Sequence, residues 1–192
     1  SSMDANIVYS SFDQFSNNNI KDQITKAEFQ INTTEEIINT NSNFKVGSQS
    51  CYFPGIAGGR ITTYIPELNL ETNDFTVEFW SYAEEQTMPY ALFFGSDSNT
   101  NLNLFIQDGS ASGNISLTIG TTRIINTGKK YTPNRWMHYA VTRENGVFTV
   151  YENGIKIGET SEYTQVNISM VDLAIGGNSS TNNTSYKGYI DD

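Results

Sequence analysis

The chain has 192 residues, a formal net charge of −10 and a single cysteine, Cys51. The negative charge argues against nucleic acid as a partner, because phosphate binding needs clustered Lys and Arg. It also disfavours anionic glycans and anionic membranes as ligands. No apolar run approaches the roughly 18 residues that a membrane span needs, so we expect no membrane insertion. One cysteine excludes an intrachain disulfide, and we expect Cys51 to be buried in a strand.

Short apolar stretches separated by turn residues run through the whole chain, which is typical of an all-β domain. No segment predicts more than one helical turn, at Thr33–Thr40. The stretches Ser16–Lys26 and Thr33–Gln49 are expected to lack strands. In chain order, we predict strands at Ile7–Phe12, Ala27–Ile31, Ser50–Phe53, Arg60–Ile65, Phe75–Tyr82, Tyr90–Gly95, Asn101–Gln107, Asn114–Ile119, Thr122–Asn126, Trp136–Arg143, Val147–Glu152, Ile155–Gly158, Val171–Ile175 and Lys187–Ile190.

Two Asn-Gly pairs give the clearest local signal. Asn145-Gly146 and Asn153-Gly154 separate three consecutive predicted strands. Asn and Gly tolerate the positive φ angles of a two-residue hairpin turn, so these strands should form an antiparallel meander.

Alternation within Phe75–Tyr82 predicts which side chains face the core. Phe75, Val77, Phe79 and Ser81 share one side, which we assign to the core. Tyr82 shares the opposite side with Trp80, although for Trp80 we favour a core position.

Several motifs, taken in order, resemble the laminin-G-like domains of the concanavalin A-like lectin and glucanase family. They are Phe12-Asp13, Asp22, Gly47 to Phe53, Asp74-Phe-Thr-Val-Glu-Phe-Trp80, Trp136-Met-His138, Tyr151-Glu-Asn-Gly154, Ile175-Gly-Gly177 and Gly188-Tyr-Ile-Asp-Asp192. The resemblance implies an all-β jelly-roll sandwich of two antiparallel sheets, with one domain over residues 4–192.

This form of the motifs is similar to modules of phage tail and fibre proteins and of bacterial surface proteins. The resemblance therefore implies an extracellular or virion-surface location. The opening Ser1-Ser2-Met3 predicts that residues 1–3 are a cloning remnant ahead of a domain excised from a longer protein. In the family, the Ile-Asp-Asp motif leads into a final strand. Here we expect that strand either to lie beyond Asp192 or to be supplied by a neighbouring segment. Without it, an unpaired sheet edge would invite association.

The resemblance also implies a calcium site, since first and last strands are neighbours in this fold. Asp13, Asp22, Asp191 and Asp192 would supply the oxygen ligands that calcium prefers. The alternative is that the early aspartates cap turns and Asp191 faces solvent. For a ligand, the candidates are Tyr82 and Tyr90, which together with Trp80 would offer aromatic platforms from one face and its neighbouring loop.

Catalytic patterns are lacking in the sequence. The Glu-x-Asp-x-x-Glu pattern of glucanases with this architecture does not occur, and hydrolysis of a glycosidic bond needs two flanking carboxylates. His138 is the only histidine, and we expect it to be structural. We therefore predict a non-enzymatic binding or adhesion module for a glycan or a cell-surface receptor, with calcium as an aid. The alternative is a structural interaction or decoration domain that joins neighbouring protein subunits without a sugar ligand.

Overall fold

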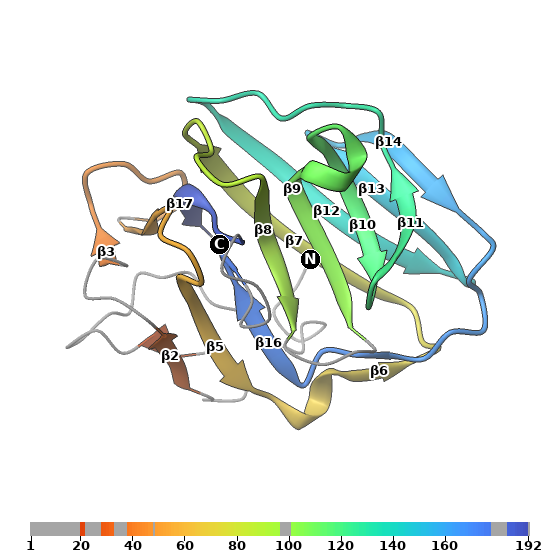
Figure 1. The fold of residues 1–192 in the computed structure, drawn as a ribbon. Coiled ribbons are helices and arrows are strands. Elements are labelled where there is room, and N and C mark those ends of the chain that lie inside the picture. The colour runs from red at the N-terminus through yellow and green to blue at the C-terminus, as the bar shows by residue number, and fades with distance from the viewer. Residues whose placement is uncertain are drawn as a thin grey trace.

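The computed structural model describes residues 20–21, 28–32, 38–47, 49–96, 101–177 and 184–191 of the chain. These residues form two stacked antiparallel sheets, with the eight-stranded sheet in front in Figure 1. In spatial order this sheet consists of β1 (Ile20–Lys21), β2 (Glu28–Asn32), β5 (Arg60–Tyr64), β16 (Asp172–Ile175), β8 (Tyr90–Ser96), β9 (Leu102–Asp108), β10 (Asn114–Ile119) and β11 (Thr122–Asn126).

The second sheet has seven strands and lies behind the first (Figure 1). In spatial order it consists of β14 (Ile155–Thr160), β13 (Val147–Glu152), β12 (Trp136–Glu144), β7 (Phe75–Ala83), β17 (Lys187–Asp191), β4 (Ser50–Pro54) and β3 (Ile38–Thr40). A small third sheet pairs β15 (Ile168–Ser169) with β6 (Asn69–Glu71). The helical elements among the described residues are two short 3-10 turns, η2 (Pro66–Leu68) and η3 (Gly109–Ala111), and no described helix is long and apolar enough to cross a membrane.

The predicted two-sheet fold is confirmed, as is the meander of β12, β13 and β14. Asn145 and Asn153 both have φ of 50°, which is the left-handed conformation that the hairpin turn requires. Two expectations were wrong, because β1 and β3 lie in stretches that we expected to lack strands. The predicted strand Ile7–Phe12 lies outside the described residues.

The core lies between the two large sheets and is rich in aromatic rings. Phe79 and Tyr139 from the seven-stranded sheet meet Phe93 from the eight-stranded sheet, with ring centroids 4.8 Å from Phe93 in both cases. Phe79 and Ser81 are buried, and Phe75 and Val77 pack against the core, so the predicted inward face of β7 is confirmed. Cys51 is also buried, as expected.

Two core tyrosines give a prediction about alkaline pH. The Tyr139 hydroxyl donates to the buried Glu152 carboxylate at 2.9 Å, and the Tyr186 hydroxyl donates to the Tyr189 carbonyl at 3.0 Å. Burial raises the pKa of both hydroxyls above the ordinary tyrosine pKa of about 10. Folding thus favours their neutral forms, so this stabilisation is complete below pH ~10 and is lost as the pH rises above it.

We therefore expect Tyr139 and Tyr186 to stay neutral in the folded protein while exposed tyrosines ionise. A spectrophotometric titration of tyrosinate, with circular dichroism on the same samples, measures this. The last tyrosines should ionise only as the β-sheet signal disappears. Reversible ionisation of all 11 tyrosines with the sheet signal intact would contradict the prediction.

Candidate functional site

Strand register places four aromatic side chains in one row across the seven-stranded sheet. Trp136 on β12 pairs with Tyr82 on β7, Tyr82 pairs with Tyr189 on β17, and Tyr189 pairs with Tyr52 on β4. Residues directly opposite each other in antiparallel strands share a face, so the four rings form a continuous strip. Their successive centroid distances are 5.6, 5.8 and 4.8 Å. We call these four residues the aromatic ladder.

The aromatic ladder lies on the outer face of the sandwich. The neighbours of its members along the strands, Ser81, Met137 and Ile190, are buried on the core side. All four ladder residues are half-buried, so part of each ring reaches the surface. Strands in a sheet lie about 4.8 Å apart, so the ladder extends over roughly 14 Å.

One flank of the ladder is built around Trp80. Trp80 pairs with His138 on one side and with Asp191 on the other, and its ring lies 5.1 Å from the His138 ring. The interpretation of Trp80 as a core residue was therefore wrong, because it faces outward with Tyr82. The Lys45 ammonium lies 4.6 Å above the Trp80 ring, where a cation is attracted by the π-electrons.

Asp191 fixes the loop that covers this flank. Its carboxylate Oδ2 accepts hydrogen bonds from the backbone N–H groups of Lys45 and Val46, both at 2.8 Å. Asp191 is fully buried, so the alternative that it faces solvent was wrong. The same loop carries Asn43, whose side-chain oxygen accepts a hydrogen bond from Trp136 Nε1 at 3.1 Å. This contact holds the indole of Trp136 in one orientation.

The other residues of the predicted calcium site, Asp13, Asp22 and Asp192, lie outside the described residues. Within the described part of the chain, no group of three His, Cys, Asp or Glu side chains could hold a metal ion. Asp191 is therefore the one predicted calcium ligand that lies among the described residues.

The opposite flank of the ladder is polar and consists of Glu84, Lys187 and Gln86, which we call the polar flank. Glu84 Oε2 accepts a hydrogen bond from the Tyr52 hydroxyl at 3.3 Å and lies 3.8 Å from Lys187 Nζ. The Gln86 side chain accepts from the Lys187 N–H and donates to the carbonyls of Glu84 and Lys187. The polar flank is thus held in place by the strand ends on which it lies.

The Tyr52 hydroxyl is a persistent donor in this site. Burial, together with the charge of Glu84 and the hydrogen bond to it, raises the pKa of Tyr52 to about 12. Tyr52 therefore remains neutral throughout the physiological range and continues to donate to Glu84.

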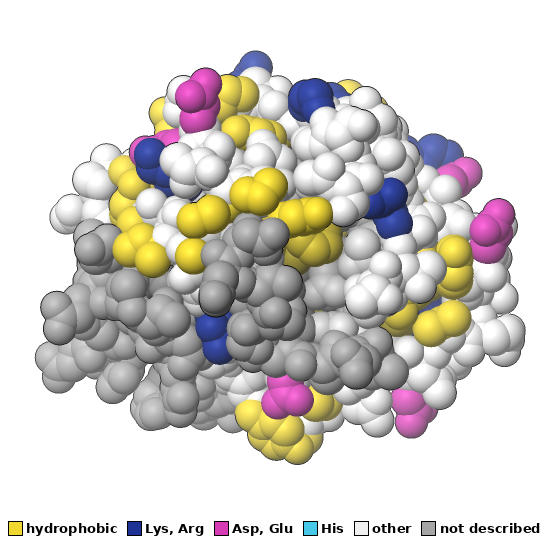
Figure 2. Space-filling model, viewed as in Figure 1, with side chains coloured by type: hydrophobic (Ala, Val, Ile, Leu, Met, Phe, Trp, Pro, Cys, Tyr) yellow, Lys and Arg dark blue, Asp and Glu magenta, His cyan; other side chains and the backbone are white. Residues whose placement is uncertain are grey.

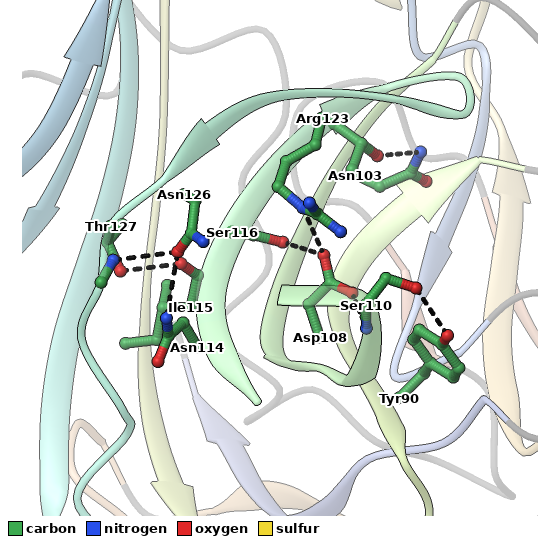
Figure 3. A network of polar contacts seen from close by, with 12 residues as sticks. Tyr90, Asn103, Asp108, Ser110, Asn114, Ile115, Ser116, Arg123, Asn126 and Thr127 are labelled. Carbon is green, nitrogen blue, oxygen red and sulfur yellow. Dashed lines mark hydrogen bonds and ion pairs between the residues drawn. The ribbon is translucent and has the colours of Figure 1, made fainter. Parts of the chain in front are cut away.

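Tyr90 lies on the other sheet, at the start of β8, so the expectation that it shares a site with Tyr82 was wrong. Its hydroxyl hydrogen-bonds to the Ser110 hydroxyl at 2.7 Å (Figure 3). Its ring meets the Phe105 ring edge-on, with the ring centroids 6.3 Å apart. Figure 2 shows the face of the eight-stranded sheet, where hydrophobic side chains form a band and charged side chains are scattered. Tyr82 and Tyr90 therefore belong to two separate surfaces.

Asp108 is the central acid of the network on the eight-stranded sheet (Figure 3). It is 3% exposed and accepts from the Ser110 N–H, the Ser116 hydroxyl and Arg123 Nε at 2.9, 2.6 and 3.2 Å. A carboxylate that is buried and bonded in this way stabilises the turn at η3 and is poorly placed to exchange protons with a substrate.

Two carboxylates on the ladder face, Glu78 and Glu84, can be compared with a glycosidase pair. Glu78 lies on the outer face of β7, and Glu84 follows directly after the strand, six residues further along the extended chain. This spacing separates their Cα atoms by about 20 Å. Glycosidase carboxylates lie about 5 to 9.5 Å apart. Glu78 and Glu84 therefore cannot act as such a pair.

Sequence reasoning found Tyr82 but missed Trp136, Tyr189 and Tyr52 as its partners. Each of these residues lies in a predicted strand. The missing information was the register, because β17 inserts between β7 and β4, which are distant from it in the chain.

The comparisons with known proteins agree with this architecture. Domain 4 of AbnA, a GH43 extracellular arabinanase from Geobacillus stearothermophilus solved in complex with arabinotriose, has a TM-score of 0.74 and 23% identity, with 96% of this chain and 87% of that chain covered. A Trypanosoma rangeli sialidase in complex with 2,3-difluorosialic acid has a TM-score of 0.61 and 14% identity, with 96% of this chain and 29% of that chain covered. Domains LG4-5 of the mouse laminin α1 chain have a TM-score of 0.51 and 13% identity, with 73% of this chain and 39% of that chain covered.

No curated protein sequence matches the chain. The family described as the concanavalin A-like lectin/glucanases superfamily matches residues 57–192. This match covers β5 to β17 and includes all the ladder residues except Tyr52. The chain therefore belongs to the concanavalin A-like lectin/glucanases superfamily.

Proposed function

We propose that the protein is a non-catalytic module that binds a glycan on the outer face of its seven-stranded sheet. The observation that carries this proposal is the aromatic ladder. Sugar rings present apolar C–H faces that pack on aromatic rings, while their hydroxyl groups require polar partners at the edges. An apolar strip flanked by a few fixed polar groups is the usual composition of a small-molecule site.

Two similar structures support a sugar ligand. The arabinanase domain was solved with arabinotriose and the sialidase with 2,3-difluorosialic acid. The arabinanase domain has the same fold as this chain over 87% of its length, and the sialidase over 29%, both at low sequence identity. They therefore support the class of ligand and not its identity. We place the protein outside the cell or on a virion surface, where such a module would meet cell-surface receptors or polysaccharides.

The module acts without catalysis in this proposal. Asp108 and Asp191 are both buried and hydrogen-bonded, and Glu78 and Glu84 are too far apart to cleave a glycosidic bond together.

Calcium assistance is part of the proposal. Carboxylate oxygens suit calcium, and Asp13, Asp22 and Asp192 would have to join Asp191 to form its site. Asp191 fits only in part, because its Oδ2 already accepts two backbone hydrogen bonds. A bound ion there would act indirectly, by fixing the loop over Trp80.

A glycan array with the intact chain tests the proposal, run once with calcium and once with EDTA. We expect a restricted set of glycans to bind, and weaker binding in EDTA if calcium holds the loop. Equal binding in both buffers would remove calcium from the proposal and leave glycan binding in place. A blank array together with stable oligomers in light scattering would instead support a structural domain that joins protein subunits.

A further inference from the structure

The polar flank points to the kind of sugar that the ladder binds, an inference that rests on the proposed function. We infer that Glu84 and Lys187 form a subsite for two neighbouring hydroxyl groups on an uncharged sugar. Glu84 follows directly after β7, two residues beyond Tyr82, and Lys187 begins β17, two residues before Tyr189. The Glu84 N–H donates to the Lys187 carbonyl at 3.1 Å, so the two residues lie in the row next to the ladder. A sugar stacked on Tyr82 and Tyr189 would have its edge over this row.

Within the described part of the structure, one carboxylate oxygen of Glu84 is available to such a hydroxyl. Its Oε2 accepts from Tyr52, whereas its Oε1 accepts no hydrogen bond from the described residues. The Glu84 side chain is 30% exposed, so Oε1 can meet a ligand at the surface. Because Tyr52 is a member of the ladder and also holds Glu84, the apolar strip and the acceptor form one continuous surface.

Lys187 supplies the complementary donor. Its Nζ lies 3.8 Å from Glu84 Oε2, a distance that allows an ion pair but exceeds the length of a hydrogen bond. The Nζ hydrogens can therefore donate to a ligand. Two neighbouring hydroxyls match this arrangement, since one can donate to the Glu84 carboxylate while the oxygen of the other accepts from Lys187.

The charge at this flank favours an uncharged sugar over an anionic one. Lys187 is paired with Glu84, so a carboxylate or sulfate added at this pair would meet the Glu84 carboxylate while the Lys187 ammonium is already engaged. The cation on the other flank is Lys45, above Trp80. At physiological salt, charges beyond about 8 Å are screened, so Lys45 could reverse the preference only for an anionic group placed directly at Trp80.

The test uses a glycan array of matched pairs, each an uncharged oligosaccharide and its sialylated or sulfated form. The wild-type chain is compared with Glu84→Gln, which keeps the shape but removes the charge, and with Trp136→Ala. Glu159→Gln is the matched control, because Glu159 is also an exposed acid paired with a lysine, at 3.1 Å from Lys156, but on edge strand β14.

We expect the wild type to prefer the uncharged member of each bound pair. Glu84→Gln should weaken that binding about tenfold, the usual loss for a hydrogen bond to a charged group. Glu84→Gln should leave binding of the acidic glycans unchanged or improved. If Glu84 had only a structural role, the substitution would weaken binding of the uncharged and the acidic glycans equally. Glu159→Gln should behave as wild type.

Two results would overturn the inference and leave the proposed function standing. One is a wild-type preference for the acidic members. The other is binding that Trp136→Ala removes but Glu84→Gln leaves at the wild-type level. A blank array with the wild-type chain would overturn both the inference and the proposed function.

Discussion

Replacing Gly188 with alanine should destabilise the protein by about 3 to 5 kcal/mol, a large part of the stability of a typical domain. Gly188 has φ of 141°, and a Cβ atom added to it would lie 2.3 Å from the Tyr82 carbonyl oxygen and 2.9 Å from the Ala83 Cα atom. Both are backbone atoms of the neighbouring strand β7, so neither can move aside as a side chain could. Relief would require β17 to separate from β7 in the centre of the sheet.

Urea unfolding followed by tryptophan fluorescence measures this effect. Gly154→Ala is the control, because Gly154 also has positive φ, at 77°, but nothing lies within 4 Å of its added Cβ atom. The control reports the cost of a positive φ angle where the added Cβ atom has open space, so a much larger loss in Gly188→Ala would indicate the close approach of β7. Equal unfolding midpoints for the two variants would show that the strands can separate without penalty.

The same glycine illustrates how far the sequence predicts the fold. Alternation in β7, the two Asn-Gly turns and the ordered motifs were enough to predict two antiparallel sheets and the inward face of β7, because these depend on local patterns. The steric requirement for glycine at position 188 and the partners of β17 were not predictable. Both depend on contacts between strands that are far apart in the chain.

The candidate site was harder to predict for the same reason. Tyr82 and Tyr90 are close in sequence, and both were chosen as ligand-binding residues, yet they lie on opposite sheets because the chain crosses from β7 to β8 between them. Trp136, Tyr82, Tyr189 and Tyr52 are spread over most of the chain, and only the register brings them together.

Replacing Tyr189 with alanine should weaken glycan binding by at least about 30-fold, the loss expected for an aromatic residue at the centre of a binding surface. Tyr189 is central in the ladder, with ring centroids 4.8 Å from Tyr52, 5.8 Å from Tyr82 and 6.5 Å from Trp136. Its removal would interrupt the strip and separate the Tyr52 ring from the Tyr82 and Trp136 rings. Trp136→Ala should have a similar effect, because Asn43 holds the indole in place before the ligand arrives.

Isothermal titration with the strongest array ligand measures these losses, and thermal melting confirms that each variant is folded. Both side chains are half-buried on the outer face, so their removal should leave the core intact. Tyr90→Ala is the matched control, since Tyr90 is also a half-buried tyrosine with one side-chain hydrogen bond, but on the opposite sheet. If binding is lost in Tyr90→Ala and retained in Tyr189→Ala, the ligand lies on the eight-stranded sheet, and the aromatic ladder is a structural feature of the outer face.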